Sequence, residues 1–164
     1  MKSQREDLLA LNRQPSDGAN EPEPETGDRS SPLEVTVIFT NEPRTLWALE
    51  RACDLARGLN ARIRLVVPQV VPYPAPMNSP PVRTEFNENR FRTMASQQSI
   101  DTRVDLYLCR DRDEVLKQVL KPASAIVIGA RKSWWPSAEK ALARRLRRRG
   151  HRVILACTEG KTNA

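Results

Sequence analysis

Apolar and polar residues alternate along most of this chain in blocks typical of strands and helices. The first strongly apolar block, residues 34–40, is rich in β-branched and aromatic side chains and predicts a strand buried on both faces. Residues 41–43, Asn-Glu-Pro, supply a capping side chain, an acid and a first-turn proline, so a helix should begin there. Apolar residues at three- and four-residue steps carry this helix to about Leu59, with Asn60 as a left-handed cap.

The pattern repeats through the rest of the chain. Six prolines in residues 68–81 predict an extended loop, because proline has no N–H for a ladder. The remaining expected elements are a strand at 62–67, a polar helix at 85–98, a strand at 104–109, a short helix at 111–120, a strand at 124–130, a basic helix at 136–149 closed by Gly150, and a strand at 152–156.

Strands that alternate with helices and read as continuous apolar runs specify a parallel sheet covered on both faces. We therefore expect an α/β fold with a doubly wound, five-stranded parallel sheet in a single three-layer domain. In such folds ligands bind at the carboxyl ends of the strands, where the strand order reverses.

Residues 1–32 differ from the rest of the chain in composition and charge. They carry four basic and seven acidic residues, a net charge of −3. Because the whole chain has a net charge of +7, the remaining 132 residues carry +10. Residues 12–32 contain no aromatic residue and no aliphatic larger than alanine, and cannot offset their ordering entropy. We expect a disordered acidic tail without a strand, with at most a frayed helical turn at 6–12, before an α/β domain at 33–158 and a polar tail at 159–164.

Several classes of protein are disfavoured by what the sequence lacks. No apolar run reaches the length of a membrane span or of a signal-peptide core, so we expect a cytoplasmic protein. Cys53, Cys109 and Cys157 form no C-x-x-C pair and are expected to be small buried side chains, without a disulfide or a metal site. His151 is the only histidine and has no acidic or serine partner nearby in sequence. We find no catalytic constellation and expect that the protein is not an enzyme.

Two segments of the chain resemble a known family. Residues 36–67, TVIFTNEPRTLWALERACDLARGLNARIRLVV, resemble the opening strand–helix–strand of universal stress proteins, and residues 124–156 resemble their closing strand–helix–strand. The resemblance covers about 33–158. It implies the strand order 3-2-1-4-5 and a homodimer formed through the last strand.

The predicted sheet edge supports the same dimer. A bare edge strand is a hazard, and the chain that follows it is short and polar. The expected dimer residues are Val153, Ile154 and Leu155.

The family's ATP-binding members have an acid after the first strand and a glycine-rich loop after the fourth. Here Thr40 replaces the acid, Lys132 replaces the second glycine, and Glu139 and Lys140 replace a later Gly-Ser or Gly-Thr pair, while Gly129 keeps the first position. Lysine blocks the close approach of the backbone to phosphate, and a carboxylate competes for the helix dipole. ATP is therefore disfavoured, and no cofactor is expected.

The ends of the first and fourth strands still form a candidate crevice for a nucleotide or another anion. Its residues are Thr40, Asn41, Gly129, Ala130, Arg131 and Lys132. Arg131 and Lys132 are either an anion site or solvated loop charges, and Asn41 is favoured as a helix cap.

The helix at 136–149 has six positive charges and one acid, more than dipole compensation explains. The charges belong to Lys140, Arg144, Arg145, Arg147, Arg148 and Arg149. This pattern fits a surface for nucleic acid, anionic lipid headgroups or an acidic partner, and equally a solvated face or a docking surface for the acidic tail. Trp135, Ala138, Leu142 and Leu146 are expected to form its inward stripe, with Trp134 or Trp135 stapling the helix start.

These features together favour a universal-stress-like, non-enzymatic regulatory or interaction protein without the usual ATP site. One alternative is a sensor that binds a nucleotide or small anion at the crevice between the first and fourth strands. A second alternative is a nucleic-acid-associated protein that acts through the basic helix at 137–149.

Overall fold

A computed structural model describes residues 9–11, 33–77 and 84–157, with the side chains of 9–11 and 84–88 left out. The elements are β1 (Leu9–Leu11), β2 (Glu34–Ile38), α1 (Glu42–Leu59), β3 (Arg62–Val70), α2 (Thr84–Ser96), β4 (Thr102–Cys109), α3 (Arg112–Val119), β5 (Ala125–Ala130), α4 (Ala138–Arg148) and β6 (Arg152–Cys157).

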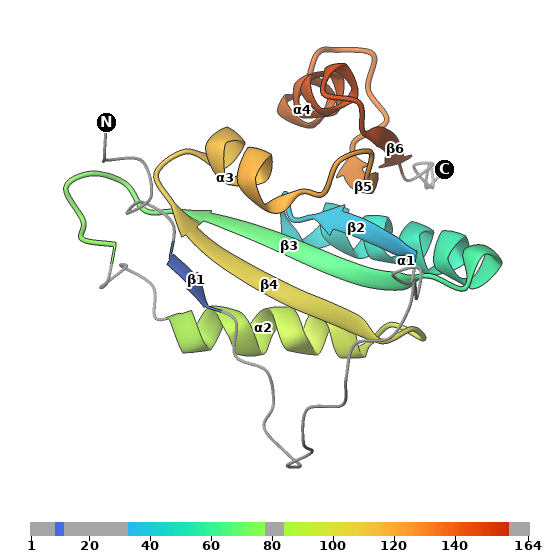
Figure 1. Cartoon of the computed structure of the whole chain (residues 1–164), viewed down its shortest axis with the longest axis horizontal. Coiled ribbons are helices and arrows are strands. Elements are labelled where there is room, and N and C mark those ends of the chain that lie inside the picture. Colours follow the sequence, from blue (N-terminus) through green and yellow to red (C-terminus); the bar gives the residue numbers. More distant parts are fainter. Residues whose placement is uncertain (1–8, 12–32, 78–83, 158–164) are drawn as a thin grey trace, which may run out of the picture.

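The strands form one sheet in the order β1-β4-β3-β2-β5-β6 (Figure 1). The five strands from β2 onward are parallel, with Val37 of β2 opposite Leu65 of β3 and Val127 of β5. Numbered among themselves, these five strands have the order 3-2-1-4-5. The predicted α/β fold and its strand order are therefore confirmed.

Helices cover both faces of the sheet and enclose two apolar cores. On one face Leu49 of α1 and Phe91 of α2 pack against Val37 and Leu65. On the opposite face α3 and α4 pack against the alternate strand residues, among them Ile38 and Ile128. The layers can be followed in Figure 1. This arrangement brings the carboxyl ends of β2 and β5 side by side at one end of the sheet.

The helix boundaries follow the local capping signals. Asn41 caps α1 by accepting a hydrogen bond from the Arg44 N–H at 3.1 Å, and Asn60 ends it with a left-handed backbone (φ 49°). Asp111 and Ser137 cap α3 and α4 through their side-chain oxygens. The caps at Asn41 and Asn60 were expected, because such signals depend on residues adjacent in sequence. Asp111 and Ser137 were expected inside their helices and are found as the caps that precede them.

β1 corrects the prediction for the N-terminal segment. Leu9–Leu11 is an antiparallel strand on β4, with Leu9 opposite Leu108 and Leu11 opposite Leu106. The expectation that residues 1–32 contribute no strand, and that 6–12 form at most a helical turn, is wrong here. Without β1 the backbone groups on one side of β4 would be an unpaired edge. The rest of the predicted tail at 1–32, and the tail at 159–164, lie outside the described residues.

β3 is longer than predicted. It continues through Pro68 to Val70, in a segment assigned to a loop, and Pro68 lies opposite Tyr107 of β4. β2 ends at Ile38, opposite Val66, so β3 beyond that point has a strand on one side only. A residue without an N–H is tolerated where one side of a strand is unpaired.

The cysteines only partly match the expectation. Cys53 and Cys109 are buried, and burial raises the pKa of the Cys109 thiol to about 11. Cys157 is exposed, because it ends the edge strand β6, so the expectation of three buried cysteines is wrong for this residue. The described residues hold no cluster of three or more potential metal ligands, and none of their helices is long and apolar enough to cross a membrane.

Candidate functional site

The predicted crevice lies where β2 and β5 end side by side. Ile38 pairs with Ile128, so the residues that follow these two strands are brought together. Thr40 and Asn41 come from the β2 side, and Gly129 and Ala130 are the last residues of β5. Asn41 is used as the α1 cap. Arg131 and Lys132 follow β5 and are exposed.

Gly129 is required by the packing of α1 on β5. A Cβ atom at this position would lie 1.8 Å from the backbone oxygen of Arg44. The first turn of α1 therefore rests directly on the end of β5, and any side chain would displace it. The glycine shared with the family's loop has a packing role here, independent of phosphate.

Arg44 forms an ion pair with Glu139, in the first turn of α4. Glu139 is 9% exposed. Burial alone would raise the pKa of its carboxyl, but hydrogen bonds from its own N–H and from Ser137, together with Arg44, lower the pKa below its ordinary value. The pair joins the first turns of helices on opposite faces of the sheet. It places a carboxylate at a helix N-terminus, the end of a helix that favours negative charge.

Arg112, the first residue of α3, also reaches this edge of the sheet. Its guanidinium donates a hydrogen bond to the Phe39 carbonyl oxygen at 2.6 Å, and burial lowers its pKa. The Arg112 Nε and the Thr40 hydroxyl are both buried without a hydrogen-bond partner in the described part of the chain. The sequence analysis missed Arg112. The sequence did contain a signal for this residue: Arg112 follows the third predicted strand, and the carboxyl end of that strand lies at the same end of the sheet as those of β2 and β5.

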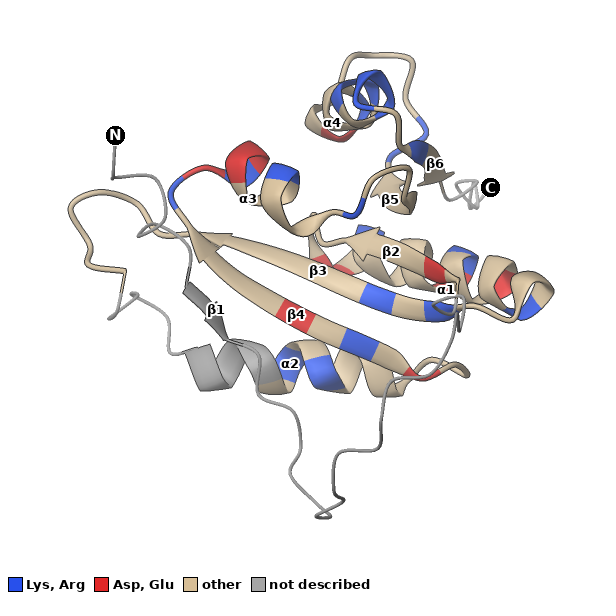
Figure 2. Ribbon diagram, viewed as in Figure 1, with Lys and Arg blue, Asp and Glu red and all other residues tan. Residues whose placement is uncertain are grey.

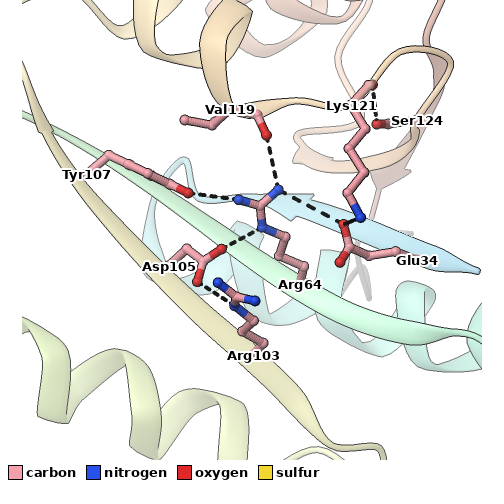
Figure 3. A network of polar contacts seen from close by, with 8 residues as sticks. All are labelled: Glu34, Arg64, Arg103, Asp105, Tyr107, Val119, Lys121 and Ser124. Atoms are coloured by element: carbon pink, nitrogen blue, oxygen red, sulfur yellow. Dashed lines mark hydrogen bonds and ion pairs between the residues drawn. The ribbon is translucent and has the colours of Figure 1, made fainter. Parts of the chain in front are cut away.

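A second group of charges lies across β3 and β4 (Figure 3). The buried Arg64 donates to Asp105 at 2.6 Å, to the Tyr107 hydroxyl at 2.8 Å and to the Val119 carbonyl oxygen at 3.1 Å. Burial by itself would lower the pKa of Arg64, but its contacts with Asp105 and Tyr107 raise it. Burial raises the pKa of the Tyr107 hydroxyl.

More exposed charges complete this polar network. Arg103 donates to the second Asp105 oxygen at 2.8 Å, and Glu34 lies 4.0 Å from Arg64 and 3.9 Å from Lys121. Three cations thus meet two carboxylates, and the central guanidinium has a partner at each nitrogen. We interpret the network as a clamp between β3, β4 and α3. The sequence signal of this network is one charged residue inside each of two apolar strands, Arg64 in β3 and Asp105 in β4, and the sequence analysis did not identify it.

The six basic residues of α4, its C-cap Arg149 included, are exposed except for the half-buried Lys140, but three of the six are held by contacts within the fold. Arg145 pairs with Asp113 of α3 at 3.0 Å, and Arg147 donates to the Val153 carbonyl oxygen at 2.8 Å. Lys140 donates to backbone oxygens of the loop before the helix. The other three, Arg144, Arg148 and Arg149, are exposed and make no ion pair in the described part of the chain. Figure 2 shows the basic residues gathered on α4.

The two tryptophans before α4 are both exposed, Trp134 to 94% and Trp135 to 73%. The predicted inward stripe is therefore wrong at Trp135 and at Ala138, which is exposed as well. Glu139 takes the inward position of the first turn, and the buried apolar residues of α4 are Leu142, Ala143 and Leu146.

The last strand has the position that the predicted dimer needs. β6 pairs with β5 on one side and has no neighbour on its other side among the described residues. Val153 is buried, and Ile154 and Leu155 are half-buried. The homodimer stays a prediction.

His151 lies between α4 and β6. Its Nδ1 is buried without a hydrogen-bond partner among the described residues, and burial together with Arg149 lowers the pKa of the imidazole. No carboxylate contact of the described chain orients it as a general base.

Comparisons with known proteins give a likeness in fold. No protein-family model matches the chain, and no curated protein matches it in sequence. A solved protein of the universal stress protein family from Burkholderia pseudomallei is similar with a TM-score of 0.50 and 15% identity, over 74% of this chain and 93% of that chain. A universal stress protein solved in complex with cAMP has a TM-score of 0.44 and 15% identity, over 77% and 98% of the two chains. The likeness to the Burkholderia protein shows that the chain has a universal-stress-like fold, as its sequence resemblance implied.

Proposed function

We propose that this chain is a non-enzymatic, cytoplasmic interaction protein on a universal-stress-like fold, which acts by association and does not use ATP. The observation that carries the proposal is the ion pair between Arg44 and Glu139. Glu139 lies in the first turn of α4, where the nucleotide loop of the ATP-binding members that the sequence resembles would present its backbone N–H groups.

The surroundings of this pair argue against a phosphate for two further reasons. The Glu139 carboxylate is ionised at neutral pH, since its hydrogen bonds and Arg44 outweigh burial and keep its pKa below the ordinary carboxyl value, and it would repel a phosphate held beside it. Gly129 is already in contact with the Arg44 backbone and is not free to cradle a ligand. We therefore propose that this end of the molecule binds other proteins or a second copy of the chain, through β6 and through the charges of α4.

Titration calorimetry with Mg-ATP tests the nucleotide half of the proposal. We expect no binding with a dissociation constant of about 1 μM or tighter, which corresponds to about 8 kcal/mol. Glu139→Gln serves as the matched variant, because it removes the repelling charge and keeps the shape. Micromolar binding by the wild-type chain would refute the proposal.

Sedimentation analysis tests the association half. Two copies of β6 paired about a two-fold axis would satisfy the unpaired backbone groups of this edge. We expect a dimer that Ile154→Lys dissociates, while Val70→Lys, at an exposed position outside β6, leaves it intact. A wild-type chain that sediments as a monomer would contradict the dimer without need of a variant.

A sensor of small anions is the second candidate, and one specific observation favours it. The Thr40 hydroxyl and the Arg112 Nε are both buried without a hydrogen-bond partner among the described residues. Arg112 also donates to the carbonyl oxygen of Phe39, the residue before Thr40. Native mass spectrometry of freshly purified protein would reveal a retained anion. A bound mass that Arg112→Gln removes and Arg110→Gln keeps would establish this function in place of the first.

A further inference from the structure

The loop of residues 131–137, between β5 and α4, presents the largest exposed aromatic surface of the described chain. Trp134 is 94% exposed and Trp135 is 73% exposed. Other exposed large apolar residues, such as Leu59 and Tyr73, are not adjacent to one another in sequence. Single exposed apolar residues are normal on a surface, but two consecutive indoles form a patch that calls for a partner. We name residues 131–137 the tryptophan loop.

Hydrogen bonds hold this loop in place. The Lys140 ammonium donates to the backbone oxygens of Ser133 and Trp135, and the Trp135 N–H donates to the Ser133 hydroxyl at 3.2 Å. Ser137 caps the helix that follows. Lys140 thus ties the loop to α4, and the exposure of the indoles is a property of a defined loop conformation.

The charge around the loop has one sign. Residues 131–157 contain nine basic residues and a single acid, Glu139, which is buried and paired with Arg44. Arg131 is exposed within the loop, and Arg144 and Arg148 are exposed one turn apart on α4 without an ion pair in the described chain. A partner for this surface must therefore combine negative charge with a place for two indole rings.

The tryptophan loop lies where an extended surface can reach it. Figure 1 shows the connection from β5 to α4 arching over the outer side of α4, at an extremity of the molecule. The apolar face of α4 is already used in the core by Leu142 and Leu146, so the helix cannot insert that face elsewhere. The tryptophan loop is the part that can enter an interface, with the arginines beside it.

We propose that the tryptophan loop and the exposed arginines of α4 bind an anionic lipid surface. Indoles are amphipathic and settle at the level of the headgroups, and arginines there meet lipid phosphates and carboxylates. A nucleic acid would also satisfy the charge, but its bases stack along a basic groove, and here the two exposed indoles are consecutive residues of a loop at an extremity of the molecule. The inference rests on the proposal that the chain acts by association. The loop shares Arg131 and Lys132 with the crevice, but the residues that its tests change, Trp134, Trp135, Arg144 and Arg148, lie outside both β6 and the crevice.

Co-sedimentation with lipid vesicles tests the inference on the full chain. We expect binding to phosphatidylcholine vesicles with about 30% phosphatidylserine at about 0.15 M salt, and none to phosphatidylcholine alone. In the variant Trp47→Phe the remaining emission comes from Trp134 and Trp135, and it should shift to shorter wavelength on binding. An oligonucleotide of single-stranded RNA, followed by anisotropy, is the competing probe.

Two double variants separate the indoles from the charges. Trp134→Ser with Trp135→Ser should weaken vesicle binding at least about tenfold. Arg144→Gln with Arg148→Gln should weaken it about 30-fold, at about fivefold for each charge. Arg51→Gln with Arg62→Gln is the matched control, because these exposed arginines lie on α1 and β3 and their removal changes the net charge equally. We expect nearly wild-type binding from the control.

Several results would overturn the inference. They are equal binding to neutral vesicles, no binding to anionic ones, equal losses in the control variant, or an emission shift produced by the RNA and absent with vesicles. Because none of these measurements involves ATP or the Ile154→Lys variant, a failure here leaves the tests of the proposed function standing.

Discussion

The polar network between β3 and β4 and the β5–α4 end of the molecule are both rich in arginine, but their arginines differ in what they contact. Arg64 has a partner within hydrogen-bonding distance at each guanidinium nitrogen. Arg144 and Arg148 have no ion pair in the described chain and are exposed. The first set stabilises the fold, and the second set is available to a partner.

The difference follows from where the charges lie. Asp105 is 4% exposed, and a charge so placed must be paired inside the fold because water cannot solvate it. A charge on the outer side of a surface helix is solvated already, and its loss costs the fold little. High charge in a sequence therefore indicates a binding surface only where the fold leaves it unpaired.

The largest expected effect comes from breaking the buried network. Asp105→Ala leaves the buried Arg64 guanidinium without its carboxylate, and we expect a loss of about 3–5 kcal/mol in the free energy of unfolding, measured by urea denaturation. The double variant Arg64→Met with Asp105→Leu should recover most of this loss, since it removes both charges. A loss below about 1 kcal/mol in Asp105→Ala would show that the network is not a clamp.

The next largest effect comes from Gly129, near the end of β5, against which the first turn of α1 packs. Gly129→Ala would place a Cβ 1.8 Å from the Arg44 backbone oxygen, and we expect a loss of about 3 kcal/mol by thermal unfolding. Gly58→Ala is the matched control: a Cβ at Gly58 meets no atom within 4 Å, and alanine in a helix should stabilise by up to about 1 kcal/mol. Equal stability of the two variants would mean that α1 does not rest on β5.

The ion pair between Arg44 and Glu139 should have an intermediate and pH-dependent effect. The pKa of Glu139 is lowered in the fold, so its contribution is present above the ordinary carboxyl pKa of 4.5 and is lost as the pH falls through the folded value. We expect Glu139→Gln to lose about 1–2 kcal/mol at pH 7 and to approach the wild-type stability in acid. A difference that does not change with pH would contradict this.

The smallest expected effect on stability comes from the exposed arginines. Arg144→Gln with Arg148→Gln should change the free energy of unfolding by less than about 0.5 kcal/mol, because both side chains are exposed and neither makes an ion pair with a described residue. The same variant should lose vesicle binding, so the comparison between paired and unpaired arginines is sharpest here. A large loss of stability would show that these arginines stabilise the fold, as Arg64 does.

The sequence by itself determined most of the fold. The alternation of strands and helices and the caps at Asn41 and Asn60 were predicted from residues close together in the chain. The rule of right-handed connections left a short list of parallel sheets, and the family resemblance implied the strand order that the structure has. The residues of the predicted crevice were also brought together, because parallel strands end at one edge.

Tertiary structure alone decided how the charged and aromatic residues are used. The ion pair of Arg44 with Glu139 spans 95 residues, and the contact of Arg64 with Asp105 spans 41. Trp135 has the spacing of an inward residue but is exposed, because Glu139 takes the inward position. Leu9–Leu11 became a strand because β4 offered an unpaired edge. Local pattern cannot predict such outcomes, because each depends on a partner that only the folded chain brings within reach.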